Sequence, residues 1–118
     1  MTNKILDLDT LKENYEGDED LLLSARDTFL ENYEVLYEAI GSAAQKGDLL
    51  QLSNSSHALK GSTGVFWPRD LQGLLEGVED ADEAKRLEIY NRDKDQIDSL
   101  LKQLVDELTA LQLQDLVA

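Results

Sequence analysis

Apolar residues recur at steps of three and four positions along almost the whole chain, and this spacing constrains the fold more than any other feature. Such steps place side chains on one face of an α-helix, whereas a strand needs alternation at every second position. Pro68 is the single proline among 118 residues, and helix-favouring Leu, Ala, Glu, Asp, Lys and Gln dominate the composition. The sequence therefore predicts an all-α protein.

The first part of the chain contains two predicted helices. A short helix is expected over residues 7–15, and Gly17 then breaks the chain. Asp18 is a suitable N-cap for a long helix over residues 19–46, because its carboxylate could accept an unpaired N–H of the first turn. Gly47, preceded by a lysine, is expected to act as the C-cap of this helix.

A third helix is predicted to open at Asp48. Asp48 and Gln51 have the spacing of a capping box, in which each side chain bonds the backbone N–H of the other residue. This helix is expected to run to about residue 66 and to end there, because a residue that precedes proline avoids the helical conformation. Pro68 then suits the first turn of a fourth helix.

The remaining sequence predicts one more long helix. Residues 80–94 are very polar and fit an exposed helix, a loop or both, whereas residues 95–113 carry a clear stripe of Leu and Ile. Four substantial amphipathic helices with short connections predict an antiparallel four-helix bundle with a short additional N-terminal helix. We expect residues 1–118 to form a single domain.

Charge and composition narrow the possible partners. The net charge of −14 would repel nucleic acids and anionic lipid surfaces, so protein partners are expected. The chain has no cysteine, which excludes disulfides and thiolate sites. No stretch approaches the roughly 20 consecutive apolar residues that a membrane span needs. We therefore expect a cytoplasmic protein, and a monomer is the simplest expectation.

The only histidine, His57, lies on the third predicted helix. At about 100° per residue, His57, Lys60, Gly61 and Gly64 share one helix face, which is separate from the leucine-rich face. His57 is thus predicted to project outward. Each glycine inside a helix costs about 1 kcal/mol relative to alanine, so two on this face suggest space cleared for a partner.

The neighbours of His57 fit phosphate chemistry. A neutral imidazole is a good nucleophile, and the ammonium of Lys60, one turn away, could stabilise a bound phosphoryl dianion. If one ring nitrogen carries phosphate, the other must hold a proton, and an acceptor beside it would fix the tautomer. A surface histidine without a function would have the same position on the helix.

The segment His57-Ala58-Leu59-Lys60-Gly61-Ser62 resembles the H-x-L-K-G-S signature of histidine-phosphotransfer (HPt) domains of two-component phosphorelays. The resemblance covers about residues 5–110. Its further matches are a Gly-Asp break before a long helix, a Phe on that helix, a Gly-Asp pair before the histidine helix, and a Leu and a Glu on the helix after it: Gly17-Asp18, Phe29, Gly47-Asp48, Leu71 and Glu79.

The resemblance implies a freestanding phosphocarrier that is not an independent catalyst. His57 would accept a phosphoryl group at Nε2 and exchange it with the aspartate of a response-regulator receiver domain or take it from a sensor histidine kinase. Lys60 would neutralise the phosphoryl group, Gly61 would allow close approach of the partner, and Glu79 would orient the ring through its other nitrogen. No cofactor of its own is implied, and Mg²⁺ is expected on the receiver.

One position departs from the family pattern. HPt domains commonly have glycine near the end of the histidine helix, where this chain has Trp67. We expect Trp67 to pack into the core, because large aromatic side chains usually bury. The receiver is expected to dock over the second and third helices around His57, with Val65 in the docking surface.

Two other functions stay open on the sequence. An acidic helical bundle could bind proteins without any phosphate chemistry, in which case His57 would be dispensable. His57 could also act as a general base if other groups assembled around it in space. Metal sites are not indicated, because residues 91–95 lack the glycine and closing glutamate of a calcium loop, and zinc would need more than one histidine.

Overall fold

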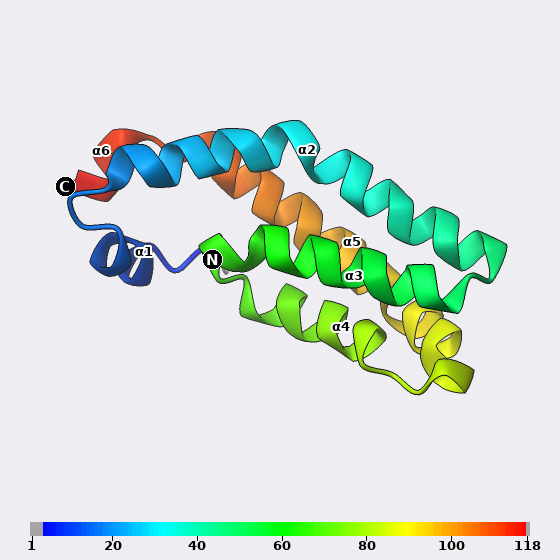
Figure 1. Ribbon diagram of the computed structural model, residues 1–118. Helices are drawn as coiled ribbons and strands as arrows, with labels where there is room; N and C mark the ends of the chain where they lie inside the picture. Colours follow the sequence, from blue (N-terminus) through cyan, green and yellow to red (C-terminus); the bar gives the residue numbers. More distant parts are fainter. Residues whose placement is uncertain (1–3, 118) are drawn as a thin grey trace.

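The computed structural model describes residues 4–117, and within that range it contains helices, turns and no strand. The helices are α1 (Leu8–Asn14), α2 (Glu19–Lys46), α3 (Leu49–Thr63), the 3₁₀ helix η1 (Gly64–Phe66), α4 (Arg69–Glu79), α5 (Glu83–Ala110) and α6 (Leu113–Val117) (Figure 1). The all-α prediction is confirmed. No helix in the described range is long and apolar enough to cross a membrane.

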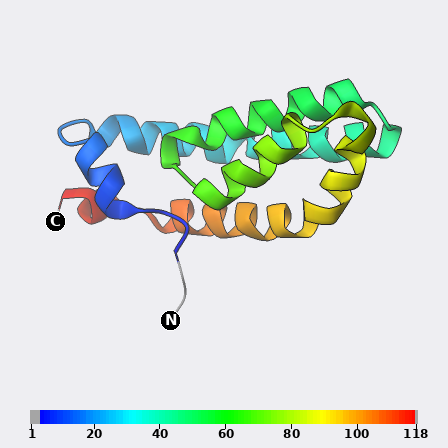
Figure 2. The same ribbon diagram turned by 90° about the horizontal axis from the view of Figure 1, so that it is seen from below.

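Helices α2 to α5 run alternately up and down and form the predicted four-helix bundle (Figures 1 and 2). Helices α2 and α5 have 28 residues each, whereas α3 has 15 and α4 has 11. The two long helices therefore extend beyond the two short ones at one end of the bundle. The predicted α1 and the unpredicted α6 lie side by side at this end, and α6 also contacts α2. Leu11 of α1 and Leu116 of α6 are buried there and close this end of the core.

A single apolar core joins the helices. Most of the buried apolar side chains come from α2 to α5, and within each helix they recur mainly at steps of three, four or seven residues. They include Leu22, Phe29, Ile40, Leu52, Leu59, Leu71, Leu75, Val78, Ile97, Leu101, Leu104 and Leu108. The rings of Phe29 and Phe66 pack edge to face, with centroids 5.6 Å apart. This core fixes the direction in which each helix presents its opposite, exposed face.

The predicted caps are only partly correct. Gly47 ends α2 in the left-handed conformation with φ 69°, and the Asp48 carboxylate accepts the Gln51 N–H at 3.0 Å. The returning half of the capping box is absent, because the Gln51 amide donates to Ser55 instead. Asp18 occupies the N-cap position of α2, but its side chain makes no cap bond.

The prediction for the last long helix was wrong at its start. Helix α5 begins at Glu83, so most of the polar stretch 80–94 is helical, and it ends at Ala110. Leu87 and Ile89 are partly buried against the core. Together with the partly buried Tyr90 they anchor this part of the helix, whereas the many charges around them hide the periodicity in the sequence.

The expectation that Trp67 packs into the core was also wrong. Trp67 is 42% exposed, and the preceding residue, Phe66, is the aromatic that is fully buried. Trp67 links η1 to α4 in the left-handed conformation with φ 53°. Pro68 is the N-cap of α4 and not a residue of its first turn. The left-handed backbone explains why glycine would suit position 67.

We predict that Trp67→Gly is more stable than Trp67→Ala. Both variants remove the same indole, but alanine must adopt a left-handed backbone that costs about 1 kcal/mol and glycine does so freely. Urea unfolding of the two variants should differ by about this amount in favour of glycine. Equal stabilities would show that the backbone at residue 67 relaxes out of the left-handed region when the indole is removed.

Candidate functional site

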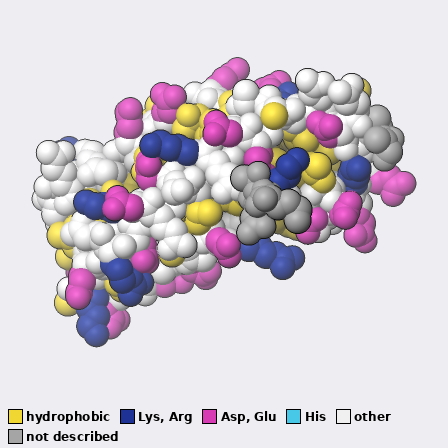
Figure 3. All heavy atoms as spheres, turned by 180° about the vertical axis from the view of Figure 1, so that it is seen from behind, with side chains coloured by type: hydrophobic (Ala, Val, Ile, Leu, Met, Phe, Trp, Pro, Cys, Tyr) yellow, Lys and Arg dark blue, Asp and Glu magenta, His cyan; other side chains and the backbone are white. Residues whose placement is uncertain are grey.

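His57 lies in the middle of α3, on the side opposite the core. Leu52, Leu59 and the small Ser56 of the same helix point inward and are fully buried, which turns the imidazole outward. The His57 side chain is 67% exposed. No histidine is visible on the back of the molecule, where Asp and Glu side chains are spread over the surface (Figure 3). The ring is therefore accessible to a macromolecular partner, as predicted.

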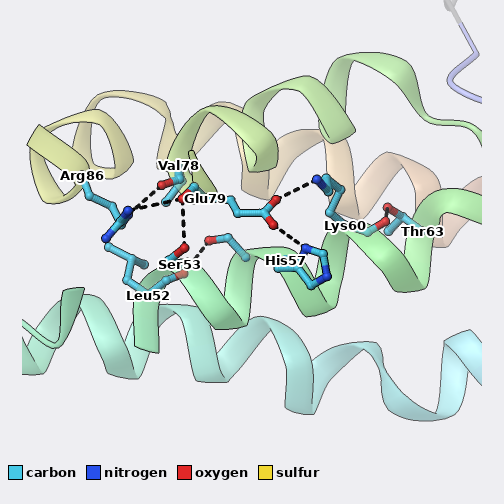
Figure 4. A network of polar contacts seen from close by, with 9 residues as sticks. Leu52, Ser53, His57, Lys60, Thr63, Val78, Glu79 and Arg86 are labelled. Atoms are coloured by element: carbon cyan, nitrogen blue, oxygen red, sulfur yellow. Dashed lines mark hydrogen bonds and ion pairs between the residues drawn. The ribbon is translucent and has the colours of Figure 1, made fainter. Parts of the chain in front are cut away.

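Glu79, the last residue of α4, connects the ring to Lys60 (Figure 4). Its Oε1 contacts Nδ1 of His57, and its Oε2 lies 2.7 Å from Nζ of Lys60. The Glu79 side chain is only 15% exposed. A single carboxylate thus holds both the ring and the ammonium, and the structure brings together His57, Lys60 and Glu79 as the family resemblance implies.

The charges in this triad are defined by their contacts. The ammonium of Lys60, followed by the hydrogen bond from His57, lowers the pKa of Glu79 against the opposing effect of burial. The hydrogen bond between Lys60 and Glu79 in turn raises the pKa of Lys60. Glu79 is therefore an anion near neutral pH, and Lys60 is a cation.

This charge state fixes the tautomer of the neutral ring. A carboxylate has only acceptors, so Nδ1 of His57 must carry the proton and donate it to Glu79. Nε2 then has a free lone pair, and no described residue hydrogen-bonds to it. The exposed nitrogen is the nucleophilic one.

Gly61 of α3 and Gly64 of η1 differ in their surroundings. A Cβ at Gly61 would meet nothing within 4 Å, whereas a Cβ at Gly64 would lie 3.3 Å from the side-chain nitrogen of Gln72 on α4. Gly64 is the first residue of η1, and the end of the Gln72 side chain lies beside its Cβ position. Of these two glycines, Gly61 is the one whose Cβ position faces open space.

A shallow groove runs between α2 and α3 beside the histidine. Gly61, Ser62 and Val65 line it from α3 and η1, and Leu21, Ser24, Ala25, Thr28, Phe29 and Asn32 line it from α2. Leu21 is among the most exposed large apolar side chains in the described chain. The groove offers a partly apolar surface next to the open face of Gly61.

Two further residues at the site, Ser53 and Arg86, were not predicted from the sequence. Ser53 donates its hydroxyl to the backbone oxygen of Glu79 at 2.9 Å, and Arg86 of α5 donates to the same oxygen at 3.3 Å. Neither residue belongs to the H-x-L-K-G-S segment. Ser53 does share a helix face with His57, one turn earlier, but Arg86 lies in the polar stretch whose fold the sequence left open.

We predict a pH signature of the Glu79–Lys60 pair. A carboxyl whose pKa is lowered on folding stabilises the protein above its ordinary pKa of 4.5, and this contribution is lost as the pH falls through the lower pKa of the folded state. The wild type should therefore be more stable than Glu79→Gln near neutral pH, and the difference should shrink in acid. Denaturant unfolding at several pH values measures it; a constant difference would contradict the prediction. The other carboxyl groups, common to both proteins, cancel in this comparison.

Comparison with known families gave one match. A family model described as Hpt domain matches residues 24–113, a range that includes His57, Lys60, Gly61 and Glu79. No curated protein and no solved structure matches the chain. The matched range covers α3, α4 and α5 completely and most of α2, and these four helices form the bundle around the site.

Proposed function

The chain belongs to the Hpt domain family, and from this premise we propose that His57 accepts a phosphoryl group at Nε2 and relays it to or from the aspartate of a response-regulator receiver domain. Hpt domains are phosphocarriers of two-component relays. The observation that carries the proposal is the exposed ring whose Nδ1 is held by Glu79, which leaves Nε2 open to solvent.

The proposed transfer exchanges a P–O bond on the receiver for a P–N bond on His57. The Nε2 lone pair of His57 attacks the phosphorus of a receiver's aspartyl phosphate, a P–N bond forms, and the P–O bond to the aspartate breaks as the carboxylate leaves with the electron pair. The ring gains positive charge during attack. Glu79, already bonded to Nδ1–H, stabilises this charge and needs no rearrangement to do so. The reverse step returns the phosphoryl group to an aspartate.

Lys60 has a separate role in this proposal. Its ammonium is one helical turn from His57 and lies 2.7 Å from the Glu79 carboxylate. The raised pKa of Lys60 keeps it charged, so it can stabilise the three oxygens of the phosphoryl group after transfer. Mg²⁺ is expected on the receiver and not on this chain.

The receiver is proposed to dock over α2 and α3. Gly61 presents no side chain there, and Val65 and Leu21 flank the groove beside it. A surface with only scattered apolar residues fits weak, transient binding, because a relay must release its partner. The upstream donor would be a sensor histidine kinase or another receiver, and the protein is expected to act as a cytoplasmic monomer.

The experiment that tests the function uses purified protein and a receiver domain carrying labelled phosphate. We expect the label to move onto this chain as an acid-labile, base-stable phosphoramidate. If a panel of receivers and kinases leaves the folded protein unlabelled, the relay function is refuted. Binding of a receiver without phosphoryl transfer would then favour the protein-binding module. Hydrolysis of the receiver's phosphate by this chain would favour His57 as a general base.

A further inference from the structure

We propose that Arg86 is a positioning residue that, together with Ser53, holds Glu79 in place to orient His57. This inference rests on the proposed function of His57. Arg86 contacts neither the ring nor the carboxylate, and it acts through the backbone at the end of α4 (Figure 4).

The end of α4 needs an external partner. The last carbonyls of a helix have no intrahelical donor, and a glycine after the last residue often supplies the turn that satisfies them. Asp80 follows α4 instead, and the last turn of α4 contains no basic residue. Arg86 supplies the donors: its Nε bonds the Val78 oxygen at 3.0 Å, and its Nη2 bonds the Glu79 oxygen at 3.3 Å.

The same guanidinium connects two more segments. Its Nη1 donates to the oxygen of Leu49, the first residue of α3, at 3.0 Å, and its Nη2 also bonds the Ala81 oxygen at 2.7 Å. One planar group therefore joins the start of α3, the end of α4 and the following turn to α5. A lysine could not make this set of bonds, because its ammonium lacks the fixed fork of five N–H donors.

Ser53 holds the same Glu79 oxygen from the side of the histidine. It lies one turn before His57 on the same face of α3, and its hydroxyl donates to the Glu79 oxygen at 2.9 Å. The backbone of Glu79 is thus held between Arg86 and the helical turn that precedes His57. A glutamate at a helix end would otherwise lose backbone and side-chain freedom each time it engaged the ring. The hydrogen bonds from Arg86 and Ser53 already restrict the backbone of Glu79, so less conformational entropy is lost when its carboxylate bonds the ring.

A purely structural role for Arg86 makes a different prediction. If the guanidinium only closes the end of α4, its loss would lower the stability of the bundle and leave the state of the ring unchanged. If it positions Glu79, its loss changes the His57 tautomer in a protein that is still folded. The tautomer of the single histidine therefore separates the two roles.

The experiment compares Arg86→Met with Arg92→Met in the full chain. Arg92 is on the same helix, its side chain is 69% exposed, and its guanidinium bonds Asp93. ¹⁵N NMR of the unphosphorylated proteins reports which ring nitrogen of His57 is protonated. We expect protonation at Nδ1 in wild type and Arg92→Met, and a tautomer mixture in Arg86→Met. Phosphorylation of Arg86→Met should slow about tenfold, the lower end of what losing an orienting partner costs a metal-bound histidine.

Two further variants keep the test decisive. In a Glu79→Gln background, Arg86→Met should cause no additional slowing, because its effect passes through the carboxylate. If Arg86→Met does not fold, Ser53→Ala, which removes one of the two bonds to the Glu79 oxygen, should show the same tautomer mixture to a smaller extent. A wild-type tautomer pattern in folded Arg86→Met, or in Ser53→Ala where Arg86→Met does not fold, overturns the proposal. The NMR measurement needs no phosphate, so it tests the role of Arg86 independently of the relay. If the wild-type protein accepts no phosphate, that result refutes the relay function but not the positioning of Glu79 by Arg86.

Discussion

His57→Gln is expected to abolish labelling of this protein by a phosphorylated receiver. The chain has one histidine and no cysteine, so no second imidazole or thiol can take over the phosphoryl group. Glutamine keeps a polar side chain of similar length but has no nucleophilic nitrogen with a free lone pair. The loss should be complete, because the variant removes the acceptor atom itself.

The fold should survive this substitution. The ring is 67% exposed and has one side-chain partner, Glu79, which keeps Lys60 as its counterion. Exposed substitutions usually change stability by less than about 0.5 kcal/mol, so circular dichroism and urea unfolding should be close to wild type. Acid-labile label that persists on folded His57→Gln would place the phosphoryl group on another residue and refute the proposed acceptor.

Gly61→Gln is expected to change stability and function in opposite directions. A side chain at Gly61 meets nothing within 4 Å, and replacing a glycine inside a helix by glutamine gains roughly 0.5–1 kcal/mol. The same side chain would stand beside His57 in the path of the receiver. Since misplacing reactants by about 1 Å can cost about 100-fold in rate, we expect transfer to slow by about this factor.

Gly73→Gln is the matched control for this prediction. Gly73 lies inside α4, is exposed, and has equally open space around its Cβ position, but it does not line the groove between α2 and α3. It should gain similar stability and keep the wild-type rate of transfer. Equal rates in both glycine variants would show that the receiver does not approach over Gly61. Stopped-flow or rapid-quench transfer with urea unfolding measures both effects.

Local sequence patterns were enough for the helices whose ends carry their own signals. Helix α2 has the predicted bounds, because Gly47 and the apolar steps between it and Gly17 define them without help from the rest of the chain. The outward direction of His57 followed from its place relative to Leu52 and Leu59. Where these signals were weak, as at the start of α5, the prediction failed.

The part of the site that lies on one helix was predictable from the sequence, and the part that lies on two helices was not. The spacing of His57, Lys60 and Gly61 follows from one helix, so the sequence alone determined that they share a face. The contact of Glu79 with His57 was expected only from the family resemblance, because no periodicity links residues on two different helices. The neighbour of Gly64 was not predictable for the same reason, because Gln72 lies on α4.

The sequence by itself determined an all-α chain, the helix that carries the only histidine, and the exposure of that histidine. All three depend on periodicity and turn residues, which act over a few positions. Only the tertiary structure decided that Phe66 and not Trp67 fills the core, that one carboxylate holds both His57 and Lys60, and that Arg86 joins three segments behind it. These contacts arise from how α3, α4 and α5 pack, and side chains distant in sequence meet only when the whole core has chosen one arrangement.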